Sequence, residues 1–312
     1  MIFLGIDTSN YTTSCAVYDS DNNSVIQQKM LLPVKSGEKG IRQSDAVFHH
    51  TQQLSVILKN LFSRFTGKID AIGVSARPRD VEGSYMPCFT VGLNTALSIS
   101  AVTGIPCFEF SHQSGHVAAA LYSAGKLSLL EREFIAFHIS GGTTEGLLVK
   151  PDNYSVIKEK ILCSTEDINC GQAIDRCGVM LGLKFPCGRE LEELSMKSAK
   201  EYDPKIKLKN GNCCLSGVEN QCMKMFSDGI EPCDIAAYCL DYVKATVDKM
   251  TEFCIATAGS LPVLYAGGVM SNKRITSYLS KKYNAFVASP EFSSDNAAGV
   301  AVLASLKVKS NV

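Results

Sequence analysis

Apolar and polar positions alternate along this chain in two characteristic ways, one typical of strands and one of helices. The first segment, MIFLGIDTSNYTTSCAVYDS, predicts two strands joined by a polar turn. A similar unit at 134–149, FIAFHISGGTTEGLLV, again joins two apolar strands through a turn of Gly, Ser and Thr. Two such units in separate halves of the chain predict an internally duplicated fold.

The segments between and after these units alternate in type. Apolar residues recur at helical spacing in DAVFHHTQQLSVILKNLFSRF, CFTVGLNTALSISAVTG, CGQAIDRCGVMLGL, RELEELSMKSAK and IAAYCLDYVKATVDKMTEFCIATAG. Gly104 is placed to end the second of these helices. Buried strands are predicted in IDAIGVSA, IPCFEF and LPVLYAGGVMSN, whereas 203–230 reads as loop with a short strand. Strands alternating with helices indicate an α/β architecture.

The domain organisation follows from the absence of a separating linker. No Ser/Thr/Pro-rich or charged linker divides the chain, so we expect two tightly associated lobes around a cleft. The expected N-terminal lobe comprises 1–125 plus 290–312, and the C-terminal lobe comprises 126–289.

Composition narrows the class of protein. The formal net charge is zero, so no global positive field favours nucleic-acid binding, and an RNA partner would need a local patch or a second protein. The 13 cysteines are scattered, without a CxxC pair, which favours reduced and mostly buried thiols in a cytoplasmic protein. The N-terminus resembles neither a signal peptide nor a membrane span, and no membrane association is expected.

The segment SHQSGH at 111–116 carries the first candidate chemistry. His112 and His116 are four residues apart, ahead of the apolar run VAAALYSA, so on a helix both imidazoles share one face. This spacing suits a metal clamp, and equally two structural histidines. Asp295 in SSDNAAG is either a helix N-cap or a third ligand, and two histidines with one carboxylate suit iron or zinc.

Two glycine turns carry the second candidate chemistry. SGGTT at 140–144 presents backbone N–H groups that can receive phosphate oxygens, or it is a tight hairpin turn. AGGVMSN at 266–272 joins a strand to a helix start at Ser271 and Asn272. Together with the N-terminal turn, these elements favour a nucleotide site. The turn at 77–80, RPRD, is a solvated loop or an anion-binding lip.

Several motifs, in this order along nearly the whole chain, resemble the TsaD (Gcp) family. They are FLGIDTS, GIRQSDAVFHH, SHQSGH, HISGGTT, GQAIDRCGVMLGLKFPCG, YAGGVMSN and PEFSSDNAAGVA. Members of this family have the duplicated actin-like ATPase fold. They transfer threonylcarbamoyl from threonylcarbamoyl-AMP to a tRNA adenosine next to the anticodon.

The resemblance implies roles for individual residues. His112, His116 and Asp295 correspond to ligands of one divalent iron or zinc ion, and His138 is a candidate further ligand. An adenine nucleotide (threonylcarbamoyl-AMP, AMP or ATP) would contact a second set. That set is His138, Ile139, Ser140, Gly141, Gly142, Asp175, Gly188, Gly267, Gly268 and Asn272. No general base is identified.

The chain also departs from the family pattern. Ser114, Thr143 and Gln172 stand where the motifs have Glu, His and Glu. Two functions therefore remain: the transferase itself, or a diverged paralogue that binds metal and adenine nucleotide as a regulatory or scaffolding subunit. A metalloprotease is disfavoured because H-E-x-x-H is absent. The implied partners are a TsaB-like paralogue, a TsaE-like small ATPase and tRNA, with a homodimer as a further option.

Overall fold

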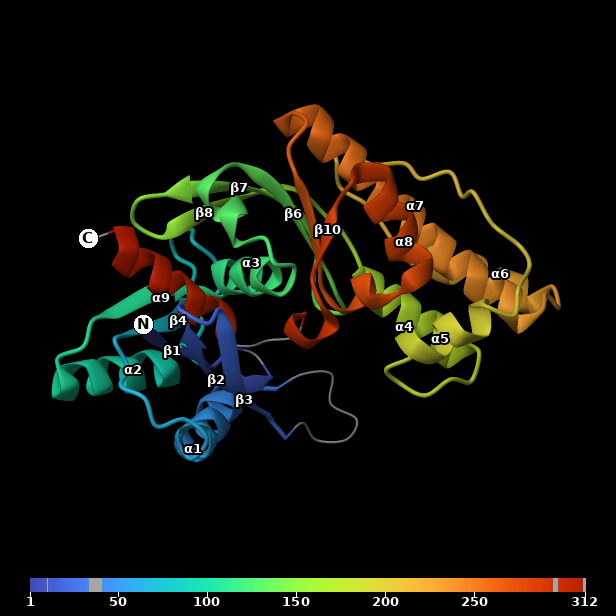
Figure 1. Cartoon of the computed structure of the whole chain (residues 1–312). Coiled ribbons are helices and arrows are strands. Elements are labelled where there is room, and N and C mark those ends of the chain that lie inside the picture. Colours follow the sequence, from blue (N-terminus) through green and yellow to red (C-terminus); the bar gives the residue numbers. More distant parts are fainter. Residues whose placement is uncertain (10, 34–40, 294–296, 311–312) are drawn as a thin grey trace. The chain divides into compact units, whose positions relative to one another are not determined.

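The computed structural model describes residues 1–9, 11–33, 41–293 and 297–310 (Figure 1). The chain forms two compact units. Unit 1 comprises Met1–Arg132, Lys150–Glu159 and Phe292–Val312, and unit 2 comprises Glu133–Val149 and Lys160–Glu291.

The sheet of unit 1 has five strands in the order β3-β2-β1-β4-β5. These are β1 (Ile2–Asp7), β2 (Thr12–Asp19), β3 (Ser24–Leu31), β4 (Ala71–Arg77) and β5 (Cys107–Ser111). β1, β2 and β3 form an antiparallel meander, whereas β4 lies parallel to β1 and β5 parallel to β4. The carboxyl ends of three parallel strands therefore meet at one edge of this sheet.

The described part of unit 1 contains four α-helices. They are α1 (Gln43–Phe62), α2 (Phe89–Thr103), α3 (His112–Ser123) and α9 (Ala298–Ser310), with a 3₁₀ helix at Leu127–Glu131. Gly104 ends α2 in the left-handed conformation, at φ 73°, as predicted. α9 packs closely on β1 and β4, where a Cβ at Gly5 would lie 2.1 Å from the Ala297 carbonyl oxygen.

The sheet of unit 2 repeats this topology. Its strand order is β10-β9-β6-β7-β8, so a meander is again followed by parallel strands. The strands are β6 (Phe134–Ile139), β7 (Thr144–Asp152), β8 (Val156–Ser164), β9 (Val263–Ala266) and β10 (Phe286–Val287). β6 and β7 occupy the places of β1 and β2, which confirms the duplication predicted from the two strand–turn–strand segments.

Among the described residues of unit 2, five α-helices pack against its core, and Figure 1 labels them α4 to α8. They are α4 (Cys170–Met180), α5 (Gly188–Ser195), α6 (Ser216–Ser227), α7 (Pro232–Ala258) and α8 (Lys273–Tyr283), with short 3₁₀ helices at Gly268–Ser271 and Pro290–Phe292. The prediction of loop and short strand for 203–230 was wrong, because α6 occupies its second half. Val218, Cys222 and Met225 recur at helical spacing there and pack on the core.

Burial of the cysteines follows the prediction from composition, since ten of the thirteen are buried. Across the described part of the chain, none of the helices combines the length and the apolar character needed to cross a bilayer.

Candidate functional site

The two histidines of SHQSGH lie together on the first turns of α3. Ser111 ends β5 and caps the helix, and its hydroxyl accepts from the Ser114 amide at 3.0 Å. This cap starts α3 at His112, so both histidines are helical and share a face. Their Nε2 atoms approach to 2.9 Å. The predicted one-turn geometry is therefore present.

Asp7 orients the first of these histidines. Its Oδ2 lies 2.8 Å from Nδ1 of His112, and the carboxyl group is buried. An ionised carboxylate only accepts hydrogen bonds, so the His112 proton resides on Nδ1 and the Nε2 lone pair faces His116. A carboxylate that fixes the tautomer in this way is the usual outer partner of a metal-ligating histidine.

The strand ends explain how Asp7 reaches the helix. Asp7 ends β1, Ser75 lies near the end of the neighbouring parallel β4, and β5 leads directly into α3. The Ser75 hydroxyl donates to Asp7 at 2.5 Å and the Ser9 amide donates at 2.8 Å. Burial raises the pKa of Asp7, but the interaction with His112 and the hydrogen bonds from Ser75 and Ser9 outweigh it, so the pKa lies below its usual value.

Contact with α9 holds the histidine helix in place. Gly115 lies between the two histidines in sequence, and its carbonyl oxygen would be 1.8 Å from a Cβ at Gly299. Only glycine at position 299 permits this approach. The packing of α9 on the sheet thus helps to fix the position of α3, and with it the two imidazoles.

Glu159 is a buried acid beside the same helix. Both of its carboxylate oxygens are buried, and neither makes a well-formed hydrogen bond to the described residues. Burial raises its pKa to about 7, while the Ser114 hydroxyl partly opposes the shift. Asp80, which pairs with Arg77 at 2.7 Å, raises the pKa further, and Arg77 lowers it. Arg77 is therefore already paired with an acid within the RPRD turn.

The donor set of unit 1 fits a metal ion. Two imidazoles on one helical face, one of them held by a carboxylate, supply a matched pair of nitrogen ligands. The predicted third ligand, Asp295, lies outside the described residues. His138, the candidate further ligand, lies on β6 of unit 2 in register with Glu145. The two histidines of α3 remain the residues on which a metal prediction rests.

A separate pocket lies within unit 2. It has a volume of about 570 Å³, in the range typical of small-molecule sites. Five residues predicted to bind nucleotide line it: Gly141, Asp175, Gly188, Gly268 and Asn272. Sequence reasoning missed the others, which are Gly171, Ile174, Pro186, Arg189, Glu192, Val269 and Ser271. Most of these lie within two residues of a predicted position, so the pocket is formed by the same segments on which the nucleotide prediction was made.

Two polar side chains shape this pocket. Asp175, on α4, accepts a hydrogen bond from the Cys187 amide at 2.7 Å. Burial raises the pKa of the Asp175 carboxyl group. Asn272 caps α8 by accepting from the Ile275 amide at 3.2 Å, which confirms the predicted helix start. Each residue therefore has a structural contact and still lines the pocket. A carboxylate here suits hydroxyl donors such as those of a ribose.

The glycine turns differ in how they contribute. The Ser140 hydroxyl accepts from the amides of Gly142 and Thr143, at 3.2 and 3.0 Å, so these amides are not the uncovered donors predicted from SGGTT. Gly141 lines the pocket, and Gly142 does not appear among its lining residues. Gly267 supports the site indirectly. At φ 102°, its missing Cβ lets the turn pack against β6, where a Cβ would lie 2.3 Å from the Ile139 carbonyl oxygen.

The duplicated meander-plus-parallel topology and the pocket define an α/β protein of the actin-like ATPase type. Solved structures support this fold. One is component A of the (R)-2-hydroxyglutaryl-CoA dehydratase of Acidaminococcus fermentans, with a TM-score of 0.57 and 16% sequence identity over the full length of both chains. Another is full-length HypF in the phosphate- and nucleotide-bound form, with a TM-score of 0.62 and 12% identity, where the match covers 98% of this chain and 55% of HypF. At such identities the likeness shows the fold alone.

The sequence assigns the family. The pattern of the family described as "TsaD: tRNA N6-adenosine threonylcarbamoyltransferase" matches residues 23–302, and the chain belongs to this family. The tRNA N6-adenosine threonylcarbamoyltransferase of Thermosipho africanus is 30% identical over 97% of this chain and 93% of its own. That of Archaeoglobus fulgidus is 26% identical over 99% and 92%.

A longer relative also matches. The probable bifunctional tRNA threonylcarbamoyladenosine biosynthesis protein of Thermoplasma acidophilum is 27% identical over all of this chain. The present chain spans 57% of that protein.

Proposed function

We propose that this chain is a tRNA N6-adenosine threonylcarbamoyltransferase, which transfers threonylcarbamoyl from threonylcarbamoyl-AMP to the tRNA adenosine next to the anticodon. The observation that carries the proposal is the Asp7-oriented pair His112 and His116, in a chain whose family match is nearly complete. The pocket of unit 2 supports the nucleotide part of the reaction.

The histidine pair would hold one divalent metal ion, iron or zinc, with Asp295 as the proposed third ligand. Such an ion supplies Lewis acidity toward a carbonyl or carboxylate oxygen when bound. Asp7 keeps the His112 proton on Nδ1 and leaves Nε2 for coordination. Ser75 and Ser9 hold Asp7 in turn. This chain of hydrogen bonds fixes the imidazole before a ligand arrives.

The pocket residues would bind the adenylate. Asp175 accepts hydrogen bonds from the ribose hydroxyls, and Gly141 and Gly268 leave room for the nucleotide, because nothing lies within 4 Å of a Cβ built at either position. Arg189 lines the same pocket and supplies a cation for the phosphate. Of the remaining predicted contacts, His138 and Ile139 lie at the end of β6, and Ser140, Gly142 and Gly267 belong to the two glycine turns beside the pocket.

The transfer itself balances as one substitution. The exocyclic N6 of the tRNA adenosine attacks the carbamoyl carbon, and a carbon–nitrogen bond forms. The bond from that carbon to the phosphate oxygen breaks, AMP leaves with the electron pair, and N6 gives up a proton. Positioning of the two substrates supplies a large part of such an acceleration.

The proposed partners follow from the family. We propose a TsaB-like paralogue and a TsaE-like small ATPase as protein partners, tRNA as the acceptor, and the cytoplasm as the setting. The chain has zero net charge, so a partner protein would supply part of the positive surface that binds tRNA.

A reconstituted transfer assay tests the proposal. The metal-loaded chain, its partners, unmodified tRNA and threonylcarbamoyl-AMP are mixed, and AMP release is measured together with the modified nucleoside. We expect the two products in equal amounts. AMP release without modified adenosine would show hydrolysis of the adenylate, and would contradict transfer to tRNA.

A further inference from the structure

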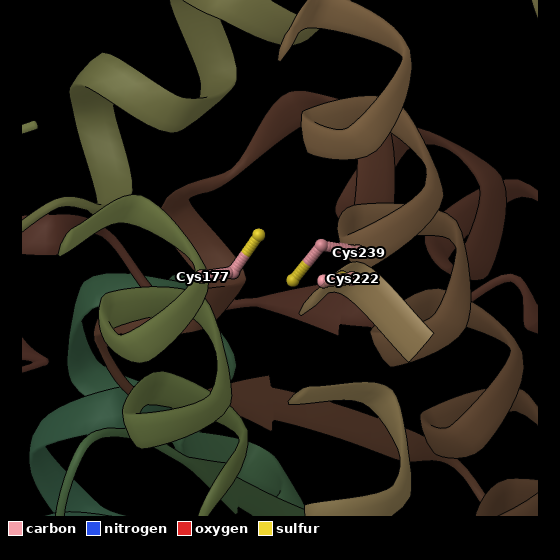
Figure 2. Close-up of side chains that lie close together, drawn as sticks. All are labelled: Cys177, Cys222 and Cys239. Carbon is pink, nitrogen blue, oxygen red and sulfur yellow. The ribbon is translucent and has the colours of Figure 1, made fainter. Parts of the chain in front are cut away.

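Three cysteine side chains converge in the core of unit 2, and none of them lines the pocket. Cys177 lies on α4, Cys222 on α6 and Cys239 on α7, and each is at most 1% exposed. All three sulfur atoms lie within 4.8 Å of one another. Figure 2 shows the three side chains close together, with Cys177 on one helix and Cys222 and Cys239 on the opposite side. From this geometry we propose that Cys177, Cys222 and Cys239 form a binding site for a soft, divalent metal ion of the Zn²⁺ class.

The separation of the sulfurs suits one shared ion. Zn²⁺ binds thiolate sulfur at about 2.3 Å, so sulfurs bound to the same ion lie roughly 4 Å apart. The cluster is therefore close to the required size before any ion binds. Soft sulfur ligands select soft or borderline metals over Mg²⁺ and Ca²⁺, which prefer oxygen. The ligand set thus also differs in kind from the two imidazoles of α3.

Charge favours a divalent ion over a monovalent one. Three thiolates around a divalent ion leave one net negative charge in the core, whereas a monovalent ion leaves two, and buried net charge is costly. The Ala173 carbonyl oxygen lies 4.0 Å from Cys239 Sγ and offers a nearby oxygen on α4. Zn²⁺ prefers four ligands, and this oxygen is the natural candidate for the fourth.

The thiols already interact with one another. Hydrogen bonds from Cys177 and Cys239 lower the pKa of Cys222. The contact with Cys222 raises the pKa of Cys177, and the contact with Cys177 raises that of Cys239. A bound cation would replace these weak hydrogen bonds with three metal–sulfur bonds. It would also link the three helices, which otherwise meet through apolar packing, the Arg176–Glu219 ion pair between α4 and α6, and the Tyr238–Gln221 hydrogen bond between α7 and α6.

The position of Cys177 gives the site a structural consequence. Cys177 follows Asp175 by two residues on α4, and this helix also contributes Gly171 and Ile174 to the pocket. An ion bound at the cysteine cluster would cross-link α4 to α6 and α7 and so fix the position of the helix that contributes these pocket residues. The site would thereby stabilise the pocket without taking part in it.

A matched pair of buried cysteines provides the control. Cys163 and Cys254 lie in the same core with their sulfurs 3.3 Å apart, but they supply two ligands instead of three. In the titration described next, the exposed Cys214 is replaced by Ser in every protein, so that a surface thiol does not contribute.

The test is a titration of the reduced full-length chain with Cd²⁺, which forms a thiolate charge-transfer band in the ultraviolet that imidazoles do not give. We expect one equivalent of Cd²⁺ to bind with this band, and Zn²⁺ to compete for it. The band should disappear in Cys222→Ala and Cys239→Ala and persist in Cys163→Ala. A band that survives in both cluster variants, or that is lost equally in Cys163→Ala, would overturn the proposal.

A second measurement needs no variant and therefore does not depend on whether the variants fold. The wild-type chain is alkylated under partly denaturing conditions with and without Zn²⁺, and the modified cysteines are mapped by mass spectrometry. We expect Zn²⁺ to protect Cys177, Cys222 and Cys239 selectively. Equal modification with and without Zn²⁺ would contradict a metal site.

Discussion

The carboxylate of Asp7 lies 2.8 Å from Nδ1 of His112 and leaves the opposite ring nitrogen facing His116. These residues are far apart in sequence and meet because β1 and β5 end at the same edge of the sheet. The family motif supplies the histidines, and the fold supplies the acid that orients one of them.

Replacing this acid should weaken metal binding without removing a ligand. Asp7→Asn loses the charge that fixes the His112 tautomer, and we expect metal affinity to fall roughly 10- to 100-fold. A competitive chelator titration measures the change. Asp70→Asn is the matched control, since Asp70 accepts the Ile2 amide at the other end of β1. Equal affinities in Asp7→Asn and wild type would refute the orienting role.

Gly299→Ala should disturb the histidine helix from a distance. Its new Cβ would meet the Gly115 carbonyl oxygen at 1.8 Å, and overpacking of this kind costs about 1–3 kcal/mol. We expect a lower free energy of unfolding and weaker metal binding. Gly217→Ala is the control, because an added Cβ there comes no closer than 3.8 Å to Tyr242 Oη and should be neutral or stabilising. A Gly299→Ala protein as stable as wild type would contradict this prediction and would show that α9 can shift away from α3 to accommodate the added Cβ.

Glu159 should give the chain a measurable pH dependence. In the folded chain its pKa is raised to about 7, from an ordinary value of 4.5 for a glutamate side chain. Between these values the folded state binds more protons than the unfolded state, so stability falls as pH rises from 4.5 to 7. The upper limit is about 1.4 kcal/mol per pH unit in this window.

Glu159→Gln removes this titration. We expect the variant to be more stable than wild type at pH 8, with the difference shrinking as the pH is lowered to 4.5. Denaturant unfolding at a series of pH values measures it. A difference that does not change with pH would mean that the Glu159 pKa is not raised.

The pocket of unit 2 can be filled by one side chain. Gly188 lines it, and nothing lies within 4 Å of a Cβ built there. Gly188→Leu should therefore preserve folding and abolish binding of AMP, measured by calorimetry. Gly217→Leu, at a half-buried position of α6 that does not line the pocket, should bind AMP like wild type. Unchanged AMP binding in Gly188→Leu would place the nucleotide elsewhere.

Local patterns predicted much of this fold. Strong periodicity located α1, α2, α4 and α7, and the repeated strand–turn–strand segments predicted the duplication. The edge strands β3 and β8 were missed because they are half-exposed and rich in charged or amide residues. α6 was missed because its apolar face is short and because the residues before it, from 203 on, have a loop-like composition.

The site was predictable where function follows from spacing along the chain. His112 and His116 need only one helix, and the pocket glycines belong to local turns. Asp7 and Glu159 could not be found in this way, since Asp7 lies on β1 and Glu159 on β8, and only the folded chain brings each of them to α3. The cysteine cluster likewise joins three helices, one of which was not predicted.

The central claim is tested most directly by complementation. The chain and its partners are expressed in a strain depleted of its own TsaD, and the tRNA nucleosides are analysed by mass spectrometry. We predict that threonylcarbamoyl-modified adenosine returns with the wild-type chain and not with the His112→Ala, His116→Ala variant. Folded, partner-complete wild-type protein that restores no modified adenosine would contradict the assignment.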